Sequence, residues 1–454
     1  FGTLADFDAL VTRAHDLGLK VIIDQVLSHS SDQHAYFTES RQSRTNPKAD
    51  WYIWHDPKPD GSPPNNWLAI FGGPAWTWDS RRRQYYFHNF LPEQPDWNFH
   101  NPEVQDYLLD CSRFWLDRGV DGFRLDTANF YVHDAMFRDN PANPEPWAQS
   151  ANRPFEMQYT MFSKNQPENL VFMERLRALL DEYDARTTVG EIGDSHRSIE
   201  LMGQYTSGKR LHMAYSFEML GPDFSPQHFR ERIEAFFKGA PDGWPCWAFS
   251  NHDVPRFMTR WAAHAVEHDA LAKLCAAMIL SFEGSVCLYQ GEELGQTDTK
   301  LAFHELTDPE AINFYPTLPG RDGCRTPMVW EAGAPNGGFS VANKTWLPVK
   351  PPQAARAVDT QGDDSVHAFY KEMLALRKAT PALQSGKIAF LHLAEDVLAY
   401  TRGDDVLCVF NLGKEAVTLQ VPGPSETLLS QGAEGVGPTL SLEGNGFFLG
   451  RITK

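Results

Sequence analysis

The chain has 454 residues and a formal net charge of −18, with 42% hydrophobic and 22% charged residues. This length predicts one large domain with insertions, or two or three domains. The acidic balance argues against a nucleic-acid partner, which would need a basic stripe to neutralise phosphates.

The six cysteines form no CxxC pair, so neither a zinc site nor a disulfide framework is indicated. No apolar stretch approaches the length that spans a bilayer, and FGTLADFDALVTRAHDLG at the start has no signal-peptide core. We therefore expect a cytoplasmic protein without a membrane partner, present as a monomer or homodimer.

Helices alternate with short apolar strands along the chain. Apolar residues at helical spacing predict a first helix that ends at Gly18, and LKVIID after it predicts a buried strand. In the second unit Asn101 is the expected N-cap, Pro102 opens the helix and Gly119 ends it before the strand VDGFRLD.

The pattern then repeats. Helices are expected around 168–184, 195–205, 226–239 and 271–282, before the strands RTTVGE, HMAYSFE, PCWAFSNHD and SVCLYQGEE, and a closing helix around 369–376. Polar residues follow each strand, which favours a (β/α)₈ TIM barrel whose first two strands would precede Phe1. A doubly wound open sheet is the alternative.

Three domains are expected. The barrel would comprise 1–29 and 99–383, with a subdomain at 30–98 inserted after the third barrel strand, where six Trp and many Pro, Asn and Gly interrupt the helical pattern. Residues 384–454 contain the alternating segments KIAFLHL, DVLAYTR, DVLCVFNL and VTLQV, which predict a C-terminal antiparallel β domain.

The strongest polar groups lie at four predicted strand ends. They are Asp24 and His29 in DQVLSH, Arg124 and Asp126 in GFRLD, Glu191 in GE, and His252 and Asp253 in NHD. A lone Asp at a strand end more often caps a helix or pairs with Arg. A closed barrel would bring all four strand ends together.

Hydrolysis of a glycosidic bond needs one carboxylate at the anomeric carbon and a second, protonated one at the departing oxygen. Arg124 shares a strand face with Asp126, so its charge would keep that carboxylate ionised. Glu191 has no basic neighbour in sequence, and we expect nearby carboxylates to favour its protonated form, as a general acid requires.

The segments DQVLSHSS, GVDGFRLDTAN, GEIGD and FSNHDVPR, in this order and spacing, resemble the four conserved regions of the α-amylase superfamily, glycoside hydrolase family 13. DWYIWHDPK, PPNNWLAIFGG, YYFHNFLPEQPDWNFHNPEV and GRDGCRTPMVW are similar to the bacterial α-glucosidase and oligo-1,6-glucosidase group. The resemblance covers nearly the whole chain.

This resemblance implies that Asp126 is the nucleophile, Glu191 the acid/base and Asp253 a third carboxylate that binds and distorts the sugar. It further implies sugar contacts from Asp24, His29, Arg124 and His252, closure by Arg321 of GRDG, and aromatic walls from Phe71 and Phe90. A loop salt bridge is the alternative for Arg321. Core packing is the alternative for the two Phe and for the Trp cluster.

The resemblance implies an exo-acting α-glucosidase that retains the anomeric configuration and releases α-glucose from small α-glucosides such as maltose and short malto-oligosaccharides. Thr127 directly follows the implied nucleophile. In this it resembles the Thr of relatives that prefer α-1,4 links, whereas α-1,6-cleaving relatives tend to have Val at the same position. Transglucosylation is an expected side activity. An α-1,6-preferring oligo-glucosidase, a glucosyltransferase or sucrose-acting relative, and a non-catalytic barrel are the alternatives.

No cofactor is required for this chemistry. The Asp-rich loop that holds a Ca²⁺ or Mg²⁺ in many relatives would lie upstream of Phe1, so a structural metal would belong to that segment rather than to the residues in hand.

Overall fold

The computed structural model describes residues 2–150, 152–423 and 425–452, so Phe1 and Lys454, at the limits of the predicted domains, lie outside the described residues. Internal contacts divide the chain into two units. Unit 1 is Phe1–Ser216 with Ala240–Trp244, and unit 2 is Phe217–Gly239 with Pro245–Lys454.

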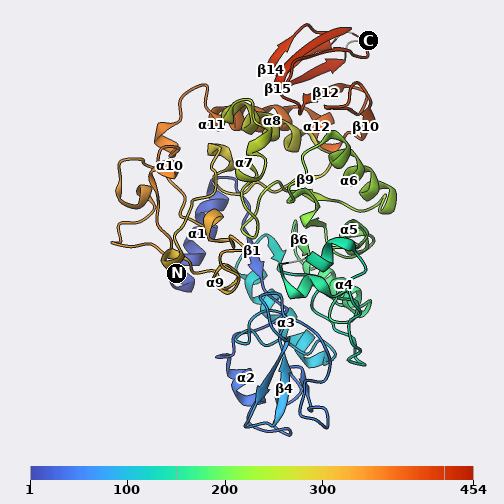
Figure 1. Cartoon of the computed structure of the whole chain (residues 1–454), viewed down its shortest axis with the longest axis vertical. Helices are drawn as coiled ribbons and strands as arrows, with labels where there is room; N and C mark the ends of the chain where they lie inside the picture. Colours follow the sequence, from blue (N-terminus) through green and yellow to red (C-terminus); the bar gives the residue numbers. More distant parts are fainter. Residues whose placement is uncertain (1, 151, 424, 453–454) are drawn as a thin grey trace. The chain divides into compact units, whose positions relative to one another are not determined.

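Unit 1 repeats a helix followed by a parallel strand. Its main sheet has the order β1-β5-β6-β7, and each neighbouring pair is parallel. The strands are β1 (Ile22–Gln25), β5 (Gly122–Leu125), β6 (Thr187–Ile192) and β7 (Met213–Ser216), and the helices before them are α1 (Leu4–Asp16), α3 (Pro102–Asp117), α4 (Glu168–Leu180) and α5 (Ser198–Thr206). Figure 1 shows this alternation from blue to green, and α5 packs on β6 and β7.

The helix ends use the residues that the sequence singled out. Asn101 caps α3 and Pro102 opens it. Gly18 and Gly119 have φ angles of 75° and 91°, in the left-handed region that glycine adopts without steric cost. The prediction that β1 is buried is wrong, because Ile22 is 43% exposed. The reason is that β1 lies at one edge of this sheet, so that one side of β1 has no partner among the described strands.

The strand register brings polar side chains to one end of the sheet. Asp24 lies opposite Arg124 between β1 and β5, and Glu191 lies opposite Tyr215 between β6 and β7. Residues two apart along a strand share a face, so Asp126, just after β5, follows Arg124 on the same side. The register alone therefore gathers one cation and three carboxylates.

The inserted residues 30–98 contain a small antiparallel sheet with an aromatic core. Its elements are α2 (Ala35–Ser40), β2 (Trp54–His55), β3 (Trp76–Asp79) and β4 (Gln84–Phe87), and the strand order is β2-β4-β3. Figure 1 labels α2 and β4 in this segment. Helix α2 was not predicted, because six residues are too few to show a helical period. Trp67 and Trp76 are buried against Phe87, which agrees with the packing interpretation for these Trp residues.

Unit 2 continues the alternation with shorter strands. Helix α6 (Pro226–Gly239) precedes β8 (Cys246–Trp247), and α8 (His268–Ser281) precedes β9 (Ser285–Val286), which is parallel to β8. Both strands are shorter than predicted, and one further backbone bond, from Cys287 N–H to the Trp247 carbonyl, follows the paired residues. The other helices are α7 (Phe257–Arg260), α9 (Pro309–Asn313), α10 (Pro351–Ala354), α11 (Val366–Ala379) and α12 (Pro381–Ser385).

The C-terminal part of unit 2 is an antiparallel sheet, as its alternating segments predict. The order is β10-β11-β12-β15-β13, with β14 also paired to β15. The strands are β10 (Ile388–Leu391), β11 (Val397–Arg402), β12 (Val406–Asn411), β13 (Val417–Gln420), β14 (Ser425–Glu434) and β15 (Thr439–Ile452). The last two strands were not predicted, because glycines interrupt their alternation.

Candidate active site

Arg124 is the centre of the polar cluster in unit 1. Its Nη1 donates to both oxygens of Asp24 at 2.9 Å and to Oδ1 of Asp126 at 2.6 Å. Its Nη2 lies 2.8 Å from Oε2 of Glu191. One guanidinium, with a side chain only 13% exposed, therefore binds three of the predicted site carboxylates.

The surrounding charges keep Arg124 firmly protonated. Burial alone would lower the pKa of Arg124, but the negative charge of Glu191, followed by Tyr215, Asp24 and Asp126, raises it. Tyr215 also accepts hydrogen bonds from Arg124 Nε at 3.3 Å and Nη2 at 2.9 Å. The guanidinium is thus fixed on several sides, as a preorganised charge requires.

Glu191 lacks a basic neighbour in sequence but not in space. Glu191 is 3% exposed, and its Oε2 lies 2.8 Å from Nη2 of Arg124. The expectation that neighbouring carboxylates favour a protonated Glu191 stays a prediction, and it did not include this guanidinium as a neighbour. Sequence adjacency could not reveal the contact, because Arg124 lies on β5 and Glu191 on β6.

Thr127 connects the two predicted catalytic carboxylates. Its backbone N–H donates to Oε2 of Glu191 at 3.0 Å, and its hydroxyl lies 3.4 Å from Oδ2 of Asp126. Its φ of 41° places a β-branched residue in the left-handed region, a conformation that costs about 1–3 kcal/mol. The strained turn after Asp126 thus presents a backbone donor to Glu191.

His29 and two phenylalanines lie beside this cluster in unit 1. Burial lowers the pKa of His29 to about 4, against the opposing charge of Asp126, so the imidazole is neutral at pH 7. The His29 ring is 5.2 Å from Phe90, and Phe90 is 5.9 Å from Phe71. The structure therefore brings Phe90 to His29 and Phe71 to Phe90.

Unit 2 carries the remaining predicted residues as a second cluster. Oδ1 of Asp253 accepts from Arg321 Nη1 at 3.0 Å and from Arg325 Nη2 at 2.8 Å. His252 Nε2 lies 3.2 Å from Oδ2 of Asp253. Arg321 also pairs with Asp308, so the loop salt bridge that was the alternative for Arg321 is present, and the sugar contact stays a prediction.

Tyr215 and Arg325 belong to these clusters but were missed from the sequence. Tyr215 follows the same rule as the predicted residues, because it lies near the C-terminal end of a strand, in HMAYSFE. Arg325 stands four residues after Arg321 in GRDGCR. Tyr215 could have been predicted from its position in the strand, whereas nothing in the spacing distinguishes Arg325 from an ordinary loop arginine.

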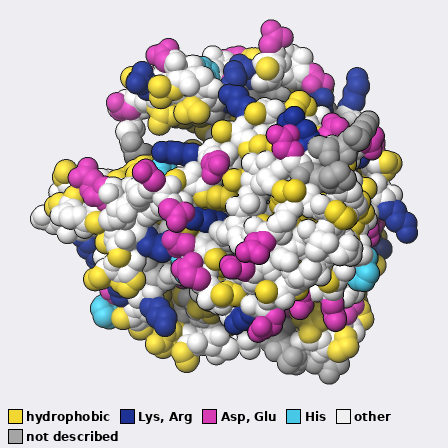
Figure 2. Space-filling view, turned by 90° about the horizontal axis from the view of Figure 1, so that it is seen from above, with side chains coloured by type: hydrophobic (Ala, Val, Ile, Leu, Met, Phe, Trp, Pro, Cys, Tyr) yellow, Lys and Arg dark blue, Asp and Glu magenta, His cyan; other side chains and the backbone are white. Residues whose placement is uncertain are grey.

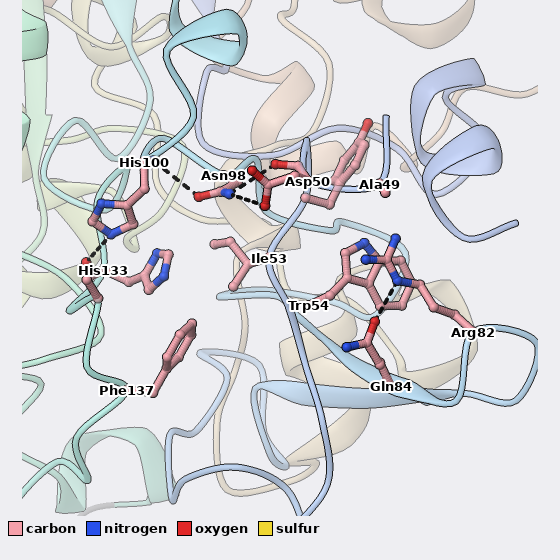
Figure 3. A pocket seen from close by; sticks show the side chains of 12 residues that line it. Ala49, Asp50, Ile53, Trp54, Arg82, Gln84, Asn98, His100, His133 and Phe137 are labelled. Atoms are coloured by element: carbon pink, nitrogen blue, oxygen red, sulfur yellow. Dashed lines mark hydrogen bonds between the residues drawn. The ribbon is translucent and has the colours of Figure 1, made fainter. Parts of the chain in front are cut away.

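A pocket of about 300 Å³ lies in and next to the inserted segment of unit 1 (Figure 3). The labelled residues around it are Ala49, Asp50, Ile53, Trp54, Arg82, Gln84, Asn98, His100, His133 and Phe137. Arg82 stacks over Trp54 at 4.3 Å from the ring centre, and Phe37 lies parallel to the same ring at 5.7 Å. Trp54 therefore packs within the protein, and the pocket is separate from the predicted sugar contacts.

On the face in Figure 2, Lys and Arg side chains are scattered among Asp and Glu. Among the helices of the described residues, none is both long and apolar enough to cross a bilayer. Within residues 2–150, 152–423 and 425–452, no group of three or more His, Cys, Asp or Glu is arranged to hold a metal ion.

The family described as "Alpha amylase, catalytic domain" matches residues 1–386. A "Probable alpha-glucosidase" of Rhizobium meliloti (strain 1021) is 54% identical over 433 residues, which are 93% of this chain and 78% of that protein. An "Oligo-1,6-glucosidase" of Heyndrickxia coagulans is 32% identical over 481 residues, covering 96% of this chain and 84% of the relative.

Solved structures agree with these relatives. The alpha-glucosyl transfer enzyme XgtA superposes with a TM-score of 0.95 at 50% identity, over 100% of this chain and 86% of that one. A mutant of MutB in complex with the substrate sucrose superposes with a TM-score of 0.88 at 28% identity, over 100% of this chain and 87% of that one.

Proposed function

Because the chain belongs to the α-amylase family of glycoside hydrolases, family 13, we propose that it is a retaining, exo-acting α-glucosidase. Its fold is the (β/α)₈ barrel of this family with a C-terminal antiparallel sheet, and it is a glycoside hydrolase of the bacterial α-glucosidase group. The observation that carries the proposal is the binding of Asp126 and Glu191 by one guanidinium, that of Arg124.

The proposed reaction has two steps. In the first, an oxygen of Asp126 attacks the anomeric carbon while Glu191 gives its proton to the departing glycosidic oxygen, which leaves as an alcohol. In the second, Glu191 takes a proton from water, and the resulting nucleophile displaces Asp126. Two inversions retain the α configuration, and the chemistry calls for no cofactor.

Arg124 suits the second step as it stands. It places a positive charge 2.8 Å from Glu191, and the second step uses the ionised form of Glu191, which accepts a proton from water. For the first step Glu191 must carry a proton, so substrate binding would have to weaken this contact. Asp24 and Asp126 offer Arg124 alternative partners at 2.6–2.9 Å.

The proposed substrate is a short α-glucoside bound by its non-reducing glucose. In this proposal Asp24, His29, Arg124, His252, Asp253 and Arg321 hydrogen-bond the sugar hydroxyls, and Phe71 and Phe90 contact the ring. Their mixture of charged donors, acceptors and aromatic faces suits a neutral sugar. Thr127 is the basis for the proposed preference for α-1,4 links, with maltose as the simplest substrate.

Glucosyl transfer is a second candidate activity. Similarity to the transfer enzyme XgtA over the full chain favours it, and a glucosyl-enzyme can react with a sugar hydroxyl in place of water. Sucrose-acting and α-1,6-specific enzymes are alternatives, since MutB is recorded with sucrose and the H. coagulans relative is an oligo-1,6-glucosidase.

The test follows the first product formed from maltose and from isomaltose by proton NMR, recorded before mutarotation. We expect α-glucose chiefly from maltose, with larger saccharides as maltose concentration rises. Asp126→Asn is the matched control, and its kcat should fall at least about 10⁴-fold. β-Glucose would overturn the retaining mechanism, whereas faster release from isomaltose would overturn only the linkage preference.

A further inference from the structure

Asp308 is a buried carboxylate bound almost entirely to one arginine of unit 2. It is 2% exposed and is the N-cap of α9. Its Oδ2 accepts from the backbone N–H of Arg321 at 2.7 Å and from Nε at 3.0 Å, and its Oδ1 accepts from Nη2 at 2.7 Å. This is a two-point side-chain pairing with an added backbone contact, which fixes the plane of the guanidinium.

The other side of the same guanidinium faces Asp253. Nη1 of Arg321 donates to Oδ1 of Asp253 at 3.0 Å, while Asp308 holds Nε and Nη2. Because the guanidinium is planar and rigid, the orientation set by Asp308 determines where Nη1 points. Asp308 thus reaches Asp253 only through Arg321.

The electrostatics agree with a permanent ion pair. Burial alone would raise the pKa of Asp308, but its hydrogen bonds from Arg321 lower it overall. Burial would lower the pKa of Arg321, and the hydrogen bonds to Asp308 raise it instead. Both groups therefore stay charged at neutral pH, so the pairing does not depend on a proton.

Backbone hydrogen bonds also hold the segments that carry Asp308 and Arg321 together. Asp322 accepts from the N–H of Thr307 at 2.6 Å and from the N–H of Asp308 at 2.8 Å. Arg321 and Asp322 are thus bound by the segment that carries Asp308, and that segment is bound by them. This arrangement gives Arg321 little freedom to turn away from Asp253.

We propose that Asp308 is a positioning residue, which holds Arg321 against Asp253 so that this carboxylate meets the sugar in one fixed orientation. The proposal rests on the function proposed above. An N-cap of α9 is the competing role, since Oδ1 of Asp308 also accepts from Glu310 N at 3.2 Å. The two roles predict different results for replacements that keep the cap.

The experiment uses Asp308→Asn and Asp308→Ser, because Asn and Ser are both good N-caps but lack the paired carboxylate. Glu305→Gln is the matched control. Glu305 forms a single ion pair in the same segment, with Lys350 at 2.6 Å, whereas Arg321 pairs with Asp308 and Asp253. For each variant we measure kcat and KM on maltose and the thermal stability. The same measurements are made on Arg321→Gln and on the double variant Asp308→Asn with Arg321→Gln.

Both Asp308 variants should lose about tenfold or more in kcat/KM, mainly in kcat, while Glu305→Gln stays within about twofold of wild type. The double variant should be no worse than Arg321→Gln alone within about twofold, because Asp308 acts through that arginine. The inference would be overturned if the loss in the double variant equalled the product of the two single losses. Full activity in both Asp308 variants would overturn it as well.

Failure of the proposed function leaves the inference testable. If the wild-type protein does not hydrolyse maltose, the crystal structure of Asp308→Asn decides. Movement of Nη1 of Arg321 away from Asp253 supports the positioning role, and an unchanged contact overturns it. If Asp308→Asn does not fold, Asp308→Ser serves in both measurements.

Discussion

Strand β5 has an aspartate just before it and another just after it, and the two are held in opposite ways. Asp121 is 3% exposed and is contacted by His15 at 2.7 Å, Lys20 at 3.1 Å and the N–H of Val21 at 2.8 Å. Asp126 is 20% exposed and shares a single arginine with two other carboxylates. Asp121 therefore has several donors to itself, whereas Asp126 shares the Arg124 guanidinium with two other carboxylates.

In the proposed mechanism, this difference separates a carboxylate that serves stability from a catalytic carboxylate five residues later. In barrels of this kind the N-terminal ends of strands serve folding, and the C-terminal ends carry the chemistry. A carboxylate surrounded by donors gains stability from folding and has little reason to react. A carboxylate that must share its cation is left available for a substrate.

The largest expected effect comes from removing the shared cation. Arg124→Gln leaves three carboxylates together without their positive partner, so kcat/KM should fall about 10²–10³-fold. The acidic limb of the pH profile should move to higher pH, because the remaining negative charges repel and bind protons more readily. Steady-state kinetics on maltose between pH 4 and 8 measure both.

Arg118→Gln is the control for this change. Arg118 also binds a carboxylate with one nitrogen, Asp8 at 2.7 and 2.8 Å, but at the C-terminal end of α3. Its activity should match wild type. Equal losses in the two variants would mean that the effect is a general cost of removing a paired arginine.

The next effect is on folding and should leave catalysis intact. Burial would raise the pKa of Asp121, but hydrogen bonds from Val21, His15 and Lys20 lower it to about 2, from 3.8. Because the pKa of Asp121 is lower in the folded than in the unfolded state, its ionised carboxylate stabilises the fold at pH values above the unfolded-state pKa. This stabilisation is lost as the pH falls from about 4 to 2. Asp121→Asn should therefore cost about 1–2 kcal/mol at pH 7, reduced from the full shift because Lys20 is 68% exposed.

Urea unfolding at pH 7 and at pH 3 measures this dependence. The difference between Asp121→Asn and wild type should shrink at the lower pH, and kcat/KM at pH 7 should stay within about twofold. A pH-independent difference would show that packing, rather than charge, accounts for the loss. A large loss of activity in a stable variant would contradict the division between the two strand ends.

The smallest effect concerns linkage preference. Thr127→Val removes the hydroxyl that lies 3.4 Å from both Ser28 Oγ and Asp126 Oδ2 and keeps the β-branched shape. We expect the maltose-to-isomaltose ratio of kcat/KM to fall a few-fold, up to about tenfold, which is about 1 kcal/mol. Thr127→Ser keeps the hydroxyl and should keep the preference. An unchanged ratio in the Val variant would remove Thr127 from the specificity argument.

Regular helices and their ends could be predicted because their signals are local. Asn101, Pro102, Gly18 and Gly119 act on their own backbone, and the structure shows each where the sequence placed it. The exposure of Ile22 could not be predicted, since burial depends on which strand lies alongside. Short elements such as α2 also gave no periodic signal.

The site shows the same division. Strand position alone selected Asp24, Arg124 and Glu191, because parallel strands end at one edge of a sheet. The contact between Arg124 and Glu191 depends on the register of β5 against β6 and on side-chain length, which a linear sequence does not encode simply. Asp308 escaped notice for that reason too, being thirteen residues from the arginine it binds.

The left-handed turn at Thr127 also limits how this protein can evolve. Its φ of 41° is already unfavourable for a β-branched side chain, so exchange between Thr and Val adds no new backbone strain. Glycine would relieve the strain but would loosen the turn that directs its N–H to Glu191. Exchange between Thr and Val therefore changes the side chain at this position, whereas the backbone turn that directs the N–H to Glu191 is kept.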